Sequence, residues 1–259
     1  MLHRLFRSLL NRVPRPWLIR LSRISRPLWE PFFRGKGFTD PINGKNYRRF
    51  LPYGYIRLRP NALSPGTLSL ERHRMLWLYL QSHTSWWNEE KKVLHIAPEQ
   101  IFYKLFRKNP RWDVTTLDLY SPLADIKADI RQMPLEDQVY DLVFCNHVLE
   151  HIPEDRQAMQ EIYRVLKPGG TAVLQIPLDS RRQETFEDPG ITDPEERTRL
   201  FGQYDHVRVY GMDFFDRLQE VGFITEAIAV KDLFTPDEIR QFALDADEIL
   251  PLAHKPLRS

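Results

Sequence analysis

Two short apolar runs separated by an amphipathic segment constrain the fold of this chain most strongly. The first run, Val139–Cys145, is bounded by polar residues, and the second, Thr171–Ile176, follows a Lys-Pro-Gly-Gly turn. Runs that are apolar throughout are typical of strands buried on both faces of a parallel sheet. Residues 153–166 between them predict a helix, with a proline in its first turn and an apolar stripe along one side. This strand–helix–strand unit predicts a parallel sheet with a right-handed crossover.

Polar residues follow the first of these strands, at the edge where such sheets bind ligands. Asn146, His147, Glu150 and His151 lie just beyond its carboxyl end. The sequence from 129 to 170, DIRQMPLEDQVYDLVFCNHVLEHIPEDRQAMQEIYRVLKPGG, resembles class I S-adenosylmethionine-dependent methyltransferases of the type 11 group. The resemblance covers about residues 92–229, over half of the chain. It implies an α/β fold with a Rossmann-like, doubly wound, mostly parallel sheet, and a transferase that uses S-adenosylmethionine as cofactor.

The resemblance places the cofactor first at the loop after the strand at residues 92–96. The family has an acidic residue there, followed by a glycine-rich loop that lets the backbone approach the ligand. This chain reads HIAPE instead, so His95 stands at the acidic position and the small Ala97 in the loop. Glu99 is the predicted partner of the cofactor's amino group.

The next strand, residues 113–120, is predicted to supply the ribose site. Asp118 matches the family's acid, and a carboxylate can accept hydrogen bonds from both ribose hydroxyls. A surface or helix-capping role for Asp118 is the alternative. Asp129 and Ile130 match the motif at the adenine edge. The predicted cofactor-binding set is His95, Ala97, Glu99, Asp118, Leu119, Asp129, Ile130, Asn146 and His147.

The catalytic residues are predicted from the chemistry of the reaction. Methyl transfer from a sulfonium needs a positioned acceptor and, for some acceptors, a base. His151, His206 and Arg208 are the predicted catalytic set: the histidines are candidate bases, and the arginine suits a polar or anionic acceptor. The long polar stretch 178–208 is predicted to cover this acceptor. Structural histidines and a salt-bridge cluster are the alternatives for these residues.

The amino-terminal part differs in composition from the rest. Residues 1–36 hold eight Arg and one Lys against one Glu, although the whole chain carries a net charge of only +2. Apolar residues recur on one side of 2–13, which predicts a basic amphipathic helix able to lie on an anionic membrane surface. Packing of this helix on its own domain or on a partner is the alternative. Three parts are predicted: the basic segment 1–36, a ribbon-like module 37–68, and a methyltransferase domain 69–259.

The ribbon-like module has four polar residues where a zinc ribbon has cysteines. Asp40 and Asn43 are separated from Ser64 and Thr67 by 20 residues, close to the spacing of a four-cysteine site, and related methyltransferases resemble this segment. None of the four offers a thiolate or an imidazole, so no zinc is predicted here, and no metal ligands are predicted elsewhere. An ordinary hairpin with Asn43-Gly44 and Pro65-Gly66 as turn residues is the alternative. The tail, 250–259, is predicted as an edge strand or a frayed end.

Composition limits the classes of function. A single cysteine, Cys145, excludes a disulfide framework and favours a reducing compartment. No apolar run is long enough to span a bilayer, and the arginine-rich start does not resemble a secretory signal, so a cytoplasmic protein is predicted. Residues 1–33 add the hypothesis of peripheral contact with the inner membrane surface.

The predicted acceptor is a small molecule or a glycan. Outside the first 36 residues the chain has no basic stripe with interleaved aromatic residues, which argues against a nucleic-acid site. An inactive methyltransferase-fold scaffold or binding protein is the alternative function, because the loop after residue 96 lacks the family's glycines.

Overall fold

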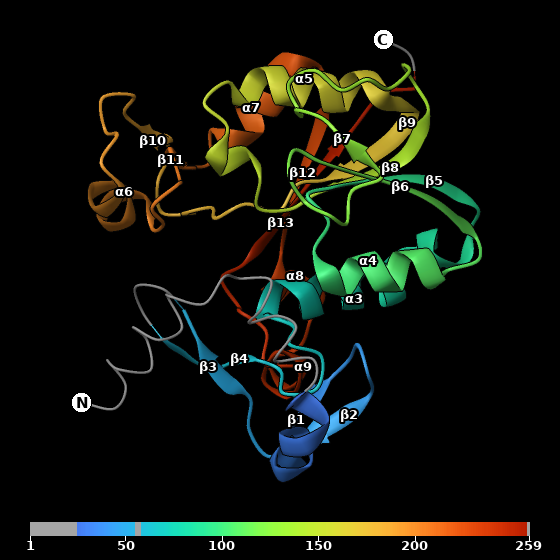
Figure 1. The fold of residues 1–259 in the computed structure, drawn as a ribbon, viewed down its shortest axis with the longest axis vertical. Coiled ribbons are helices and arrows are strands. Elements are labelled where there is room, and N and C mark those ends of the chain that lie inside the picture. The colour runs from blue at the N-terminus through green and yellow to red at the C-terminus, as the bar shows by residue number, and fades with distance from the viewer. Residues whose placement is uncertain (1–24, 55–57, 258–259) are drawn as a thin grey trace.

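The computed structural model describes residues 25–54 and 58–257 (Figure 1). The helix predicted at 2–13 lies outside these residues, so membrane contact through 1–33 stays a prediction, as does the three-part division of the chain. None of the described helices combines the length and apolar character needed to cross a membrane.

A seven-stranded sheet forms the centre of the molecule (Figure 1). All neighbouring strands are parallel except that β13 runs antiparallel to both of its neighbours. The sheet confirms the predicted Rossmann-like, mostly parallel fold. In spatial order its strands are β12 (Ile224–Ala229), β13 (Ile249–His254), β9 (Leu166–Val173), β8 (Tyr140–Cys145), β5 (Lys91–Ile96), β6 (Trp112–Asp118) and β7 (Ile126–Lys127).

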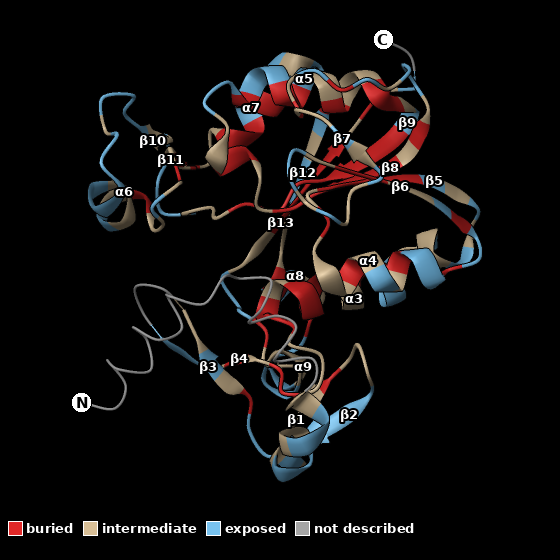
Figure 2. Ribbon diagram, in the orientation of Figure 1, coloured by how far each residue is buried: buried red, intermediate tan, exposed pale blue. Residues whose placement is uncertain are grey.

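Helices cover both faces of this sheet (Figure 1). Strand side chains alternate between the faces, so Leu142 and Phe144 of β8 join one apolar core and Val143 and Cys145 join the other. The inner strands between the two cores are mostly buried, whereas the edge strands at 224–229 and 126–127 are partly exposed (Figure 2). The first core is covered by α3 (Glu71–Ser82) and α4 (Gln100–Lys108), and the second by α5 (Asp155–Val165) and α7 (Phe214–Val221).

The carboxyl-terminal tail differs from its prediction as an edge strand or a frayed end. Strand β13 lies between β9 and β12, inside the sheet. Leu250, Leu252 and Ala253 are almost completely buried, because this strand is covered on both faces. Just after it, the Lys255 ammonium donates hydrogen bonds to two backbone carbonyls at the end of α5 and the start of β9, at 2.8 and 2.9 Å.

Below the sheet in Figure 1 lies a second layer, here called the accessory lobe, which joins residues 30–69 with residues 230–248. It contains two antiparallel hairpins and two short helices from the far end of the chain. Its elements are η1 (Glu30–Phe33), β1 (Arg34–Asp40), β2 (Lys45–Tyr47), β3 (Leu51–Tyr53), β4 (Arg59–Leu63), α8 (Val230–Leu233) and α9 (Pro236–Gln241).

The four ribbon positions are held by hydrogen bonds. Asp40 is fully buried, and its carboxylate accepts hydrogen bonds from the hydroxyls of Ser64 and Thr67. Asn43 instead donates to the hydroxyl of Tyr47 at 3.1 Å. Three of the four positions therefore meet at one polar centre that links the loop after β1 to the loop after β4.

Arg74 of α3 links the segments of the accessory lobe through hydrogen bonds. Its guanidinium is fully buried and donates to the carbonyls of Ala62 at 2.9 Å and Phe242 at 2.7 Å, and also to those of Ser69 and Ala243. Burial lowers the pKa of Arg74 to about 10, because the charged form loses its hydration.

The polar stretch predicted to cover the acceptor contains regular structure. It forms the two-stranded pair β10 (Phe186–Glu187) and β11 (Arg208–Val209), with α6 (Pro194–Phe201) between them. Asp193 caps α6 by accepting from the third residue beyond it at 2.8 Å. We call residues 178–209 the lid segment; it projects to one side of the sheet in Figure 1.

Candidate functional site

The candidate site lies where the strand order of the sheet reverses. From β5 the chain continues to β6 on one side, while β8 lies on the other, so the carboxyl ends of β5 and β8 flank a switch point. Ala97 after β5 has φ of 48°, and His147 after β8 has φ of 54°. Such values are rare outside glycine and mark two tight turns side by side at this edge.

Glu99, predicted to bind the cofactor, is already engaged by protein groups. Its carboxylate accepts from His73 at 2.7 Å, from Arg72 at 3.3 Å and from the amide of Asn146 at 3.3 Å. The carbonyl oxygen of the Asn146 side chain is buried and has no hydrogen-bond partner among the described residues. The predicted residues Glu99 and Asn146 are thus brought together, with one unsatisfied acceptor between β5 and β8.

The protonation states in this group follow from its hydrogen bonds. His73 Nδ1 accepts from the backbone N–H of Leu70, so Nε2 carries the proton that is donated to Glu99. Burial lowers the pKa of His73, which favours this neutral form. Burial alone raises the pKa of Glu99, but the neighbouring His73 and Arg72 bring it well below its usual range. Glu99 is therefore ionised at neutral pH.

His95 does not lie at the edge that the prediction assigned to it. Its ring is fully buried against Phe106 of α4, with 5.2 Å between ring centroids. Neither ring nitrogen has a hydrogen-bond partner in the described part of the chain, and burial lowers the pKa of His95 to about 4. The histidine is a neutral core residue, because β5 turns this side chain toward the apolar layer under α4. Its predicted role as a cofactor contact is corrected accordingly.

The predicted ribose and adenine residues follow β6 and β7. Asp118 Oδ1 accepts from the backbone N–H groups of Tyr120 and Ser121, at 2.7 and 2.6 Å. Its second oxygen takes no hydrogen bond from the residues that the structure describes. Leu119 is 47% exposed, so its side chain is open to a ligand at this edge.

Asp129 and Ile130 differ from each other in accessibility. Both oxygens of Asp129 are bound by the Arg131 guanidinium, at 3.0 and 2.6 Å, and these hydrogen bonds lower the pKa of Asp129. Ile130 is buried in the core beside α5. An adenine bound at this edge would share the Asp129 carboxylate with the Arg131 guanidinium.

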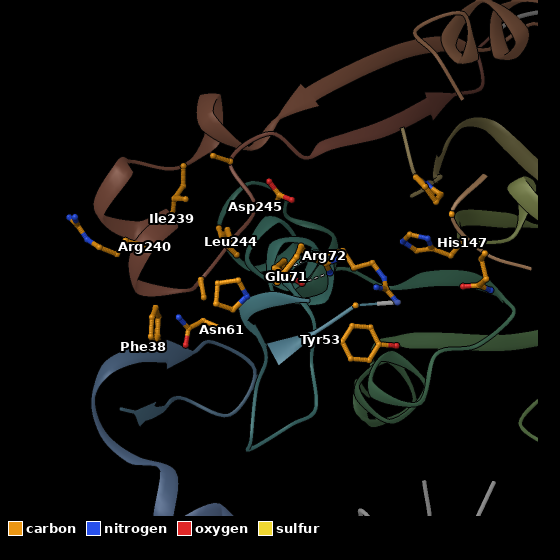
Figure 3. Close-up of a pocket in the computed structure, with 18 of the residues that line it drawn as sticks. Phe38, Tyr53, Asn61, Glu71, Arg72, His147, Ile239, Arg240, Leu244 and Asp245 are labelled. Atoms are coloured by element: carbon orange, nitrogen blue, oxygen red, sulfur yellow. Dashed lines mark hydrogen bonds and ion pairs between the residues drawn. The ribbon is translucent and has the colours of Figure 1, made fainter. Parts of the chain in front are cut away.

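A cavity of about 1060 Å³ lies between the sheet edge and the accessory lobe. Its apolar end is formed by side chains of the lobe, including Phe38, Ile239 and Leu244 (Figure 3). At the other end Arg72 extends toward His147 (Figure 3). The cavity therefore connects the lobe with the residues that follow β8.

A second cavity of about 640 Å³ shares Arg72 and His147 with the first. Glu248 lines it, between acidic and basic neighbours. Burial raises the pKa of Glu248 to about 8, although Arg72 acts in the opposite direction. This carboxyl group is mostly protonated at neutral pH.

His151 and His206, predicted as catalytic, are brought together on the wall of the larger cavity. Their ring centroids are 4.7 Å apart and the rings are nearly perpendicular, at 86°. Glu150, which the prediction did not include, lies beside them and is only 1% exposed. Glu150 and His151 belong to η3 (Leu149–His151), whereas His206 follows α6 in the lid segment.

Arg208 is a structural residue, which corrects its predicted catalytic role. Its side chain is 4% exposed, and it binds Glu187 at 2.6 Å. It also donates to the carbonyls of Leu149, Ile152 and Pro153, around the end of η3. Because its side chain is almost completely buried and each of its three nitrogens donates to protein groups, Arg208 fixes the segment that carries Glu150 and His151.

Arg72, His73, Glu150 and Glu248 are residues of the site that the sequence interpretation missed. The available signal was the run of four charged or polar residues, 71–74, at the start of an otherwise apolar helix. Glu150 follows a buried strand directly, at the same edge as the predicted histidines. Glu248 gave no such signal, because its environment is built by segments far apart in the chain.

Comparison with known proteins identifies the domain that contains this edge. Residues 84–174, from before β5 to the end of β9, match the family described as a methyltransferase domain. A sterol 4-C-methyltransferase of Caenorhabditis elegans is 41% identical over 49 residues, which cover 19% of this chain and 15% of the relative. An arsenite methyltransferase of Mus musculus is 27% identical over 108 residues, which cover 39% of this chain and 25% of the relative. The chain thus spans a quarter or less of the length of these relatives.

Solved structures with a similar fold include a 1,6-didemethyltoxoflavin-N1-methyltransferase of Burkholderia thailandensis, determined with 1,6-didemethyltoxoflavin and S-adenosylhomocysteine. It is 13% identical, covers 72% of this chain and 78% of its own, and gives a TM-score of 0.48. The match of residues 84–174 to the methyltransferase domain family confirms the resemblance that the motifs at 129–170 indicated.

Proposed function

We propose that this protein is an S-adenosylmethionine-dependent methyltransferase that acts on a small-molecule acceptor. The observation that carries the proposal is the match of residues 84–174 to the methyltransferase domain family. It is supported by polar groups at the carboxyl ends of β5, β6 and β8, where a parallel sheet binds ligands. S-adenosylmethionine supplies an activated methyl group when bound, so the protein has to position the acceptor rather than provide the reactive carbon.

The residues at the sheet edge suit this cofactor. Asp118 keeps one carboxylate oxygen free for the ribose hydroxyls while the other holds its own turn. Ala97 leaves room for close approach of a ligand to the backbone after β5. The buried, unsatisfied side-chain oxygen of Asn146 would accept a hydrogen bond from a cofactor N–H group. Glu99 is occupied by His73 and Arg72, so we assign it to fixing this edge.

The acceptor is assigned to the cavity of about 1060 Å³. Its volume is at the upper end of the range of small-molecule sites, roughly 300–1,000 Å³. Phe38 and Leu244 offer apolar contacts at one end, and Arg72 and His147 offer polar ones at the other (Figure 3). A ring-bearing or amphipathic molecule with a polar nucleophile matches this distribution better than a fully hydrated glycan.

The chain's own residues contribute positioning and the handling of a proton. The lid segment brings His206 over the acceptor cavity, next to Glu150 and His151 of η3. We assign to this polar group the removal of a proton from an acceptor hydroxyl or amine. Methyl transfer then requires only that the acceptor is positioned and that a nearby group stabilises its deprotonated form.

Calorimetric titration of the full-length protein with S-adenosylmethionine tests the proposal. In Asp118→Asn the oxygen that holds the turn is kept, but one acceptor becomes a donor, so the affinity should fall at least tenfold. Asp113→Asn, an exposed aspartate at the start of the same strand, is the matched control and should bind as the wild type does. Absence of binding to the wild type at millimolar cofactor would overturn the proposal and favour an inactive scaffold, in which Glu99 and its partners close the edge.

A further inference from the structure

Three side chains on the wall of the acceptor cavity form a group with the composition of a metal site. Glu150, His151 and His206 each offer one ligand atom, and these atoms all lie within 4.8 Å of one another. Two imidazoles and one carboxylate are ligands that zinc and ferrous iron bind in catalytic sites. The sequence analysis predicted His151 and His206 as candidate bases but not as metal ligands, because η3 and the lid segment bring the group together from positions 55 residues apart.

Both histidines are oriented through the nitrogen that faces away from the group. His206 Nδ1 lies 3.0 Å from the carbonyl oxygen of Phe201, and His151 Nδ1 lies 3.3 Å from that of Asp205. A carbonyl only accepts, so each Nδ1 carries the proton and each Nε2 keeps its lone pair. Metal-binding histidines are held in this way, with the second nitrogen donating to a carbonyl or a carboxylate.

The carboxylate of Glu150 is also positioned by a neighbouring side chain. Its Oε1 is bound to His147 Nδ1 at 3.1 Å. Its Oε2 is buried and has no hydrogen-bond partner within the described parts of the chain. The side chain is only 1% exposed, so this oxygen is shielded from bulk solvent. A buried, unpaired carboxylate oxygen is costly, and a bound cation removes that cost.

We propose that Glu150, His151 and His206 bind one divalent transition-metal ion, with zinc and ferrous iron as the best-matched candidates. All three residues line the acceptor cavity, so a further coordination position would open into it. Ligand atoms around tetrahedral zinc are roughly 3.4 Å apart, given metal–ligand distances of about 2.0–2.2 Å. The separations in the group, at most 4.8 Å, would therefore shorten by up to about 1.4 Å on binding, which side-chain rotations of the two histidines can supply.

The site also suggests a class of acceptor, and this step depends on the proposed function. An acceptor hydroxyl that coordinates the ion would lose its proton to solvent more readily. The deprotonated oxygen would then form a bond to the methyl carbon as the carbon–sulfur bond breaks, giving a methyl ether and S-adenosylhomocysteine. An oxygen nucleophile with a second oxygen beside it, as in a diol or a hydroxy-carbonyl compound, would chelate the ion best.

Cobalt(II) is the probe for the experiment, because its visible absorption reports ligand type and geometry. The full-length protein is treated with a chelator, dialysed and titrated with Co²⁺, and Zn²⁺ affinity is measured by calorimetry. We expect one ion per chain in the wild type. Glu150→Gln and His151→Gln should each weaken binding at least tenfold. His254→Gln, on β13 outside this group, is the matched control and should leave binding unchanged.

Circular dichroism spectra and melting temperatures of the variants establish that they are folded. The proposal is overturned if the wild type binds neither ion at 1 mM, or if folded Glu150→Gln and His151→Gln bind as tightly as the wild type. Cofactor binding without metal binding would remove the metal site and leave the proposed methyltransferase function intact. Metal binding without cofactor binding would support the metal site and refute the proposed methyltransferase function.

Discussion

At the scale of single residues, the acceptor side of the site depends on a buried arginine that touches no ligand. Arg208 joins β11 of the lid segment to the carbonyls around η3, and it shares Glu187 and Asp155 with Arg217. Because Arg208, Asp155 and Arg217 are almost completely buried, each depends on its charged partners to replace the hydration that it has lost. Arg208 therefore fixes the position of Glu150 and His151 without contacting a ligand itself.

Replacing Arg208 with methionine should strongly destabilise the protein. Removal of one member of a buried ion-pair network typically costs about 3–5 kcal/mol, and three carbonyls would also lose a donor. Urea denaturation measures the change. Arg181→Met is the control: Arg181 also pairs with an aspartate in the lid segment, but it is 88% exposed, so its loss should change the unfolding free energy by less than about 0.5 kcal/mol. A loss below about 1 kcal/mol for Arg208→Met would contradict this account.

Glu248 makes the stability depend on pH. Its pKa is raised to about 8 by burial, from a usual value of 4.5, so the folded state holds a proton that the unfolded chain releases between these values. Its contribution is fully present below about pH 4.5 and is lost as pH rises through about 8, with a slope of at most about 1.4 kcal/mol per pH unit. Glu248→Gln should therefore gain in melting temperature relative to the wild type between pH 5.5 and pH 8.

The exposed Glu136→Gln serves as the control for that measurement. Its melting temperature should follow that of the wild type at both pH values. If the melting temperatures of the wild type and Glu248→Gln changed in parallel with pH, the raised pKa of Glu248 would be contradicted.

At the scale of elements, α3 joins the sheet to the accessory lobe. Its apolar side packs under β5 and β8, while Arg74 at its start binds carbonyls of both the amino-terminal and the carboxyl-terminal parts of the lobe. One wall of the acceptor cavity thus depends on a buried guanidinium whose pKa is already lowered to about 10 by the loss of water.

Arg74→Met should loosen the lobe and leave the sheet in place. The four carbonyls would lose their donor, and buried acceptors left unpaired cost about 1–3 kcal/mol each. We expect faster amide hydrogen exchange at residues 59–69 and 236–246, with unchanged protection of β5 and β8. Arg240→Met, at an exposed ion pair in the same lobe, should exchange like the wild type. Equal acceleration throughout the chain would mean that the lobe and the sheet unfold as one unit.

The elements differ in how well the sequence predicted them. The strands at 139–145 and 92–96 and the helix at 153–166 were predicted well, because their apolar patterns and caps are local. His95 and Arg208 were misassigned, because motif position gave their place in the chain but not the direction of their side chains. The Glu150 group and the cavity could not be predicted, since they arise where segments distant in sequence pack together.

At the scale of the whole molecule, the sheet depends on a strand that comes after all its other members. Strand β13 contacts β9 on one side and β12 on the other, and these two strands do not pair with each other. Deleting residues 249–259 would leave two open edges and an uncovered core, so the product should be insoluble or expanded by size-exclusion chromatography. Deleting only 256–259 keeps β13 and Lys255, and should give a soluble protein with a melting temperature within a few degrees of the wild type.

The place of β13 also sets an order of events during synthesis. While the chain is being made, β5, β6, β8 and β9 can pair as they emerge, because each finds its neighbour among residues already available. β12 cannot join them until residues 249–254 have followed it. The edge of β9 therefore stays unpaired from the synthesis of residue 173 until residues 249–254 have been made, about a third of the chain, and the unfinished sheet exposes an apolar edge to chaperones over that interval.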